Sequence, residues 1–195
     1  VFFNSRFYYP VITILFLDFG LTLEQFAILN LVWALTIVLL EIPSGALADT
    51  IGRKNLLVFA GVCMVLEMSL LCFAPLGNPQ LLFYIFLANR VLSGSAEAAA
   101  SGADEALAYD SLKKEGDPDD WGKVLVKQMG FRSMGFVVAM SLGAAVYDPG
   151  LLGRVAAWFG LNISLNQDIT LRFPLYLTLA TAILTLFITL AMKRI

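Results

Sequence analysis

One short stretch, Gly45-Ala-Leu-Ala-Asp49-Thr-Ile-Gly52-Arg53-Lys54, separates two long apolar runs of this 195-residue chain. Gly52 permits a tight turn because it has no Cβ, and Gly45 allows two helices to approach closely. Asp49 and Arg53 suit a charge pair at the edge of a membrane. The stretch therefore predicts a turn between two membrane-spanning helices. A basic turn of the kind that any membrane protein can carry also fits.

The composition favours a lipid bilayer over water as the solvent of the chain. Hydrophobic residues make up 59% of the sequence and charged residues 14%, whereas soluble domains carry about 25% charged residues. The apolar blocks are long enough to cross about 30 Å of hydrocarbon. The net charge is −2 and there is no His, so we expect no nucleic-acid partner, no metal site and no cofactor.

Six apolar runs predict six transmembrane helices and hence an all-α membrane protein. The second run starts at Thr22-Leu-Glu-Gln25, a capping box whose side chains satisfy free N–H groups at a helix start. Asp18-Phe-Gly20, just before it, predicts a tight turn between the first two helices. The predicted helices span residues 2–19, 24–48, 56–74, 81–112, 121–147 and 171–192.

Most basic residues fall on one side of this topology. By the positive-inside rule that side is cytoplasmic, and six spans place both termini there, in a bacterial inner membrane. The basic residues on the cytoplasmic side are Arg53, Lys54, Lys113, Lys114, Lys123, Lys193 and Arg194. The longest outer connection, residues 149–170, has apolar residues that suit a short interfacial helix, although a plain linker also fits.

The stretch from Gly45 to Lys54 resembles the G-x-L-a-D-r-x-G-R-K/R signature of the major facilitator superfamily, which lies in the same loop of that family. Thr50 stands where the family usually has a basic residue. The segment Arg90-Val-Leu-Ser-Gly94 is similar to the R-x-x-x-G pattern of the family's fourth helix. The fifth predicted helix has no Gly followed by Pro, so the antiporter pattern of the family is missing.

The resemblance covers essentially the whole chain and implies the N-terminal six-helix bundle of a secondary transporter. It implies a small-molecule substrate, contact with membrane lipid and a second six-helix half, supplied by the same polypeptide or by a second copy. Because Val1 lies in an apolar run without Met or a leader, we expect a longer native chain. A membrane sensor or scaffold that binds without transport is the alternative, and a membrane enzyme is less favoured because no nucleophile stands with a recognisable base.

Charges inside the predicted spans are the candidate functional groups, because each costs about 2.5 kcal/mol or more to insert. Polar and small residues of the fourth helix recur at steps of three and four, which places them on one face. A rise of about 1.5 Å per residue puts four charges near the membrane centre, where they can serve substrate and protons. These four residues are Glu97, Arg90, Glu41 and Arg6.

We expect Glu97 to carry the coupling proton, with Glu41 as second choice. Burial favours a neutral carboxyl group and a nearby Arg favours its ionised form, so protonation can follow the opening of the cavity. Glu67, in the third predicted helix, has no expected partner. Cys63 and Cys72 lie about 13 Å apart along one helix and are not expected to bridge each other.

A second group of charges lies nearer the cytoplasm and predicts a gate on that side. The family resemblance implies a gating role for Asp49 only, and the spacing suggests a cross-helix pair between Glu105 and Arg132. The same pairs can instead hold helices in register. The charges of this group are Asp49, Arg53, Asp104, Glu105, Asp110 and Arg132. The predicted gate residues are Gly45, Asp49, Gly52, Arg53, Asp104, Glu105 and Arg132.

Overall fold

The computed structural model describes residues 6–161 and 165–192, and these are helical with no strand among them. The predicted all-α fold is confirmed. Residues 2–5 of the first predicted helix and the basic pair Lys193-Arg194 lie outside the described residues. The elements are η2 Tyr9–Val11, α1 Ile12–Asp18, α2 Leu23–Ile51, α3 Arg53–Cys72, α4 Pro79–Ala100, α5 Ala103–Glu115, η3 Pro118–Asp120, α6 Trp121–Tyr147, α7 Pro149–Trp158, α8 Gln167–Thr170 and α9 Phe173–Ala191.

In the described part of the chain, four helical stretches are long and apolar enough to cross a membrane. They are Leu23–Ile51, Arg53–Cys72, Pro118–Tyr147 and Gln167–Ala191. The apolar stretch Tyr9–Asp18 is shorter, and α4 carries Arg90 and Glu97 within its 22 residues. The chain is therefore a multi-pass membrane protein, but the expected number of six spans is not confirmed.

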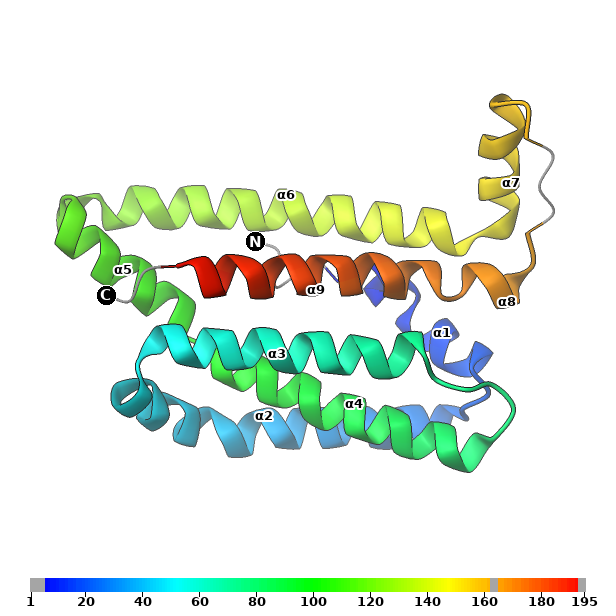
Figure 1. The fold of residues 1–195 in the computed structure, drawn as a ribbon, viewed down its shortest axis with the longest axis horizontal. Helices are drawn as coiled ribbons and strands as arrows, with labels where there is room; N and C mark the ends of the chain where they lie inside the picture. Colours follow the sequence, from blue (N-terminus) through cyan, green and yellow to red (C-terminus); the bar gives the residue numbers. More distant parts are fainter. Residues whose placement is uncertain (1–5, 162–164, 193–195) are drawn as a thin grey trace.

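The long helices lie side by side, so the bundle has two ends (Figure 1). The α2–α3 and α5–α6 turns lie at one end, which we call the α2–α3 end. The α1–α2, α3–α4 and α6–α7 connections lie at the other, which we call the α1–α2 end. The predicted capping box is present, since Thr22 Oγ1 accepts from the Gln25 N–H at 3.2 Å and Gln25 Oε1 accepts from the Thr22 N–H at 3.0 Å.

Two of the predicted helices differ from the structure. The fourth, 81–112, is divided at Ser101-Gly102, where Gly102 has φ +72°, a left-handed conformation that glycine adopts readily. The first is also divided, because Pro10 lies in the short η2 turn that precedes the seven-residue α1. Gly52 has φ +88° and alone separates α2 from α3, so the predicted tight turn at Gly52 is present.

The core of the bundle is built around α4, which packs against both α2 and α3, while α3 also packs against α9. A Cβ added at Gly94 would lie 2.8 Å from the Cβ of Thr36, closer than real Cβ atoms approach, so α2 and α4 require glycine at this contact. Nothing among the described residues lies within 4 Å of a Cβ added at Gly45. The close helix approach expected at Gly45 is therefore found at Gly94 instead.

The connection between α6 and α9 contains a helix rather than a plain linker. Figure 1 shows α7 turning away from the axis of α6 at the α1–α2 end of the bundle. Asp148 caps α7 by accepting a hydrogen bond from the Gly150 N–H at 2.8 Å. Trp158 is 91% exposed and Phe159, just after α7, is 78% exposed, so these two aromatic side chains are not packed against the described residues.

Candidate functional site

A buried cluster of charges joins the N-terminal segment to α3 and α4. Arg6 is 2% exposed, and its Nη1 lies 2.9 Å from Oε1 of Glu67, whose side chain is fully buried. The same Nη1 donates to Ser93 Oγ of α4 at 2.8 Å and to the Tyr8 hydroxyl at 3.2 Å. A buried ion pair that loses one partner leaves an uncompensated charge, so these three elements are held together at this point.

Glu67 is the site residue that the sequence reading missed. We expected no partner for Glu67, but α3 lies between α4 and α9, so Glu67 faces the core. A signal for this was present in the sequence. Glu67 follows Ala60 and Cys63 and precedes Leu71 at steps of three and four residues, and all four are buried on one helical face.

Glu97 completes the cluster from α4. Its Oε2 lies 3.7 Å from Nη2 of Arg6, and its side chain is 34% exposed, in contrast to the sealed Glu67. Arg6 therefore lies between one enclosed carboxylate and one that other molecules can reach. The charges of one Arg and two Glu sum to −1 when all three are ionised.

The other two predicted central residues form no ion pair with this cluster in the described part of the chain. Glu41 is exposed on α2, where its Oε1 accepts a hydrogen bond from Ser101 Oγ at 3.4 Å. Arg90 is buried on α4 with its guanidinium carbon 4.7 Å from the centre of the Phe16 ring, and it forms no ion pair within the described residues. Of the four predicted residues, only Arg6 and Glu97 meet.

Glu97 opens onto a cavity of about 730 Å³ between α4, α5 and α6. Its polar wall includes Arg6, Glu97, Glu105 and Arg132, and its apolar wall is made by residues of α6. Glu105 and Arg132 thus share a cavity as the spacing suggested, but no ion pair between them is found in the described part of the chain. Asp104 lines a smaller neighbouring cavity together with these two residues and Glu97.

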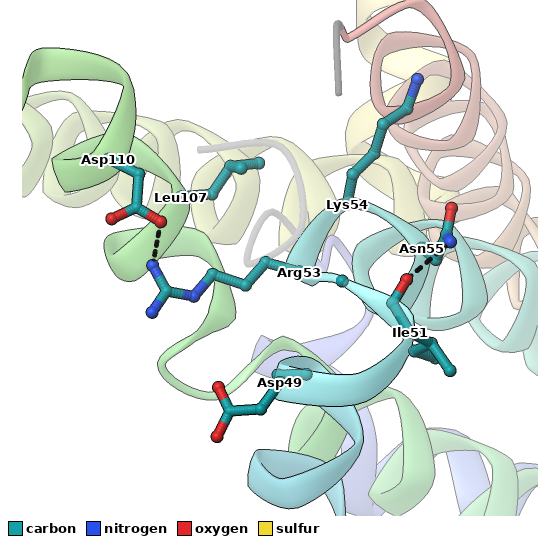
Figure 2. A pocket seen from close by; sticks show the side chains of 9 residues that line it. Asp49, Ile51, Arg53, Lys54, Asn55, Leu107 and Asp110 are labelled. Atoms are coloured by element: carbon teal, nitrogen blue, oxygen red, sulfur yellow. Dashed lines mark hydrogen bonds and ion pairs between the residues drawn. The ribbon is translucent and has the colours of Figure 1, made fainter. Parts of the chain in front are cut away.

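The signature stretch forms a set of contacts at the α2–α3 end (Figure 2). The Arg53 guanidinium pairs with the Asp110 carboxylate of α5 and donates to the Ala106 carbonyl at 3.0 Å. Lys54 Nζ donates to the Leu190 carbonyl at 2.9 Å and also to the Met192 carbonyl, at the end of α9. The turn therefore connects α3 to two other helices.

The charge pair expected between Asp49 and Arg53 is not formed. Asp49 lies in the last turns of α2 and is exposed, whereas Arg53 follows the Gly52 turn and extends toward α5 (Figure 2). Both residues line a pocket of about 290 Å³ together with Lys54 and Asp110. Asp110 therefore takes the role of partner that we had assigned to Asp49.

Comparison with known families identifies the family of the chain. A family model described as Major Facilitator Superfamily matches residues 1–192. The chain belongs to the Major Facilitator Superfamily. The resemblance at Gly45–Lys54 is thereby confirmed, and superfamily membership makes the chain a member of a family of transporters. No curated protein sequence matches the chain.

The α1–α2 end of this superfamily member is also closed by hydrogen bonds. The Tyr147 hydroxyl donates to the Asp18 carboxylate, and Thr170 Oγ1 donates to the Tyr147 carbonyl at 2.9 Å. Arg172 donates to the Cys72 and Ala74 carbonyls at 2.7 and 2.8 Å. These bonds connect α6 with α1 and α8, and join Arg172, at the start of α9, to the end of α3. No role for them was predicted.

Proposed function

We propose that this chain is part of a secondary active transporter that moves a small organic molecule across the bacterial inner membrane by alternating access, coupled to protons. One observation carries the proposal. Arg6 lies between the enclosed Glu67 and the accessible Glu97, beside a cavity large enough for a small organic molecule. An ionisable group of this kind inside a membrane protein marks a substrate or proton pathway.

Glu97 is the proposed proton carrier. Its 3.7 Å separation from Arg6 is longer than the 2.9 Å between Arg6 and Glu67, so protonation of Glu97 leaves the stronger pair intact. A proton on Glu97 brings the net charge of the cluster from −1 to zero, which favours closure of the cavity around it. Glu41 is a weaker candidate because it is exposed and contacts no cation in the described residues.

The proposed cytoplasmic gate is the set of contacts at the α2–α3 end. Arg53 and Lys54 connect the turn to α5 and α9, and Glu105 and Arg132 stand on the nearby cavity wall. Because basic residues gather at this end, the positive-inside rule supports a cytoplasmic location for it and for both termini. Asp49 is exposed, and we propose that its partner in the gate belongs to the second six-helix half.

Membrane lipid and a second six-helix half are the proposed partners of the exposed apolar surfaces. Leu39 of α2 is 70% exposed and Val126 of α6 is 71% exposed. Such apolar side chains need lipid or another protein surface to cover them. A second half, from the same polypeptide or from a second copy, would cover the side on which the 730 Å³ cavity opens.

Transport can be tested in everted membrane vesicles that contain the full-length protein and are energised to an acidic interior. A dye reports the pH gradient while a chemically broad panel of compounds is added. We expect at least one compound to dissipate the gradient with the wild-type protein but not with Glu97→Gln. Glu24→Gln is the matched control, because Glu24 is exposed in the first turn of α2. Absence of both proton release and radiolabelled counterflow would overturn the proposal.

A further inference from the structure

Arg90 differs from Arg6 because it forms no ion pair within the described residues. Arg90 is 2% exposed, and its Nε and Nη2 have no hydrogen-bond partner among the described residues. These two nitrogens form the edge of the guanidinium whose N–H bonds run parallel, which is the edge that binds both oxygens of a carboxylate. The Phe16 ring stabilises the positive charge from 4.7 Å but supplies no acceptor oxygen.

A third unused donor lies on the same cavity. Trp33 Nε1 is buried and has no hydrogen-bond partner in the described part of the chain. Trp33 and Arg90 line a cavity of about 270 Å³ whose described lining contains no carboxylate. Buried polar groups are nearly always hydrogen-bonded, so unused donors from two helices on one cavity indicate a ligand that carries acceptors.

The protein's own carboxylates do not satisfy Arg90. Glu67 is close enough to interact electrostatically with Arg90, but its ion pair is formed with Arg6. Glu97 is also directed to Arg6. Arg6 therefore has two carboxylates within ion-pair distance, whereas no ion pair or hydrogen bond joins Arg90 to Glu67 or Glu97 in the described part of the chain, even though both oxygens of Glu67 lack a hydrogen-bond partner there.

We propose that Arg90 and Trp33 bind the carboxylate of a small organic monocarboxylate. Tyr9 lines both this cavity and the 730 Å³ cavity, so the body of the ligand can extend past Tyr9 toward Met129 and Phe136 of α6. The proposal rests on the proposed transport function and names its substrate class. Nε and Nη2 are sealed from water in this structure, so a ligand reaches them only when side chains that line the cavity move.

The fluorescence of Trp33 can report ligand binding at this site. In purified full-length protein, every other tryptophan is replaced by Phe, and the fluorescence of Trp33 is titrated with straight-chain carboxylates of increasing length, the matching primary amides and the matching amines. We expect a saturable change with carboxylates only. Arg90→Gln should weaken carboxylate binding by at least tenfold, since two charge-assisted hydrogen bonds are lost. Arg154→Gln, an exposed change on α7, should leave it unaltered.

Arg90→Lys distinguishes a loss of binding from a loss of folding, because it keeps the positive charge and removes only the parallel donors. We expect it to bind carboxylates more weakly than wild type and more tightly than Arg90→Gln. Equal binding of amides or amines, unchanged carboxylate binding in Arg90→Gln, or no carboxylate binding at all would overturn the proposal. If the vesicles exchange protons for an amine or a neutral compound instead, the proposed transport is supported and the proposed carboxylate site is overturned. Carboxylate binding without transport would support the carboxylate site and overturn the proposed transport.

Discussion

Arg6 Nη1 lies 2.9 Å from Oε1 of Glu67, and neither side chain is accessible to water. This pair crosses from the N-terminal segment to α3, two parts of the chain that are far apart in sequence. Two charges buried in a membrane protein are stable only as a pair, so the contact fixes the position of the N-terminal segment beside the cavity. Everything proposed for Glu97 depends on that position.

Loss of the Glu67 carboxylate should therefore be strongly destabilising. We expect Glu67→Gln to lower the free energy of unfolding by about 3–5 kcal/mol, because the buried Arg6 would lose its nearer carboxylate partner and keep only Glu97 at 3.7 Å. Denaturant unfolding of the full-length protein in detergent measures the change. The double variant Arg6→Met, Glu67→Leu should recover most of the loss, and Glu24→Gln should change stability by no more than about 0.5 kcal/mol. Wild-type stability of Glu67→Gln would show that the pair does not hold the N-terminal segment.

Two glycines provide a matched test of helix packing. Gly94→Ala should destabilise the protein by about 1–3 kcal/mol, because the added Cβ meets the Cβ of Thr36 at 2.8 Å. Gly45→Ala should be neutral or stabilising by up to about 1 kcal/mol, since the space around Gly45 is open and glycine weakens helix interiors. Thermal unfolding in detergent compares the two. Equal effects would mean that α2 and α4 are not in close contact at Gly94.

The contacts of Arg53 should control access to the α2–α3 end more than they control stability. Both members of the Arg53–Asp110 pair are about a third or more exposed, so the loss of the pair should cost less than about 1 kcal/mol. We expect Arg53→Gln to accelerate the labelling of a cysteine placed at the buried Leu107 several-fold, in protein whose Cys63 and Cys72 are replaced. Lys123→Gln breaks only the exposed pair with Asp120. It should leave the labelling rate unchanged, and a similar acceleration there would show that surface charge alone controls access.

The exposed aromatic residues of α7 should lie in the membrane interface. In proteoliposomes with Trp158 as the only tryptophan, lipids brominated near the carbonyl groups should quench its fluorescence more than lipids brominated at the chain ends. Tryptophan prefers the level of the headgroups, and α7 begins directly after the membrane-spanning α6. Full quenching by aqueous iodide with no effect of brominated lipid would place α7 in water instead.

The sequence predicted local features of the fold better than contacts across the bundle. The Thr22–Gln25 capping box and the Gly52 turn depend on neighbouring residues, and both are found where they were expected. Depth along straight helices placed Arg6 and Glu97 in one group of four central charges, and these two are the members of the group that form an ion pair. The signature stretch gave the family because its glycines and charges lie within ten residues of one another.

Contacts that depend on helix order and rotation could not be read in this way. Apolar runs do not say which helices are neighbours, so the enclosure of Glu67 between α4 and α9 was missed. The partner of Arg53 is Asp110 rather than Asp49 because the turn directs the side chain across to another helix. The break at Gly102 was missed because a single glycine inside a long helical pattern does not distinguish a bend from a continuous helix.

That break separates two mechanical roles within what the sequence presents as one helix. α4 is fixed to α2 by the contact of Gly94 with Thr36 and by the hydrogen bond from Ser44 Oγ to the Ala98 carbonyl at 2.8 Å. α5 is attached to the α2–α3 turn through Arg53, packs Ala103 and Leu107 into a shared core with α3 and α4, and bears Glu105 on the cavity wall. Rotation at Gly102 would tilt α5 relative to α4. Movement at one face of the membrane would then change the shape of the cavity while Arg6, Glu67 and Glu97 keep their geometry.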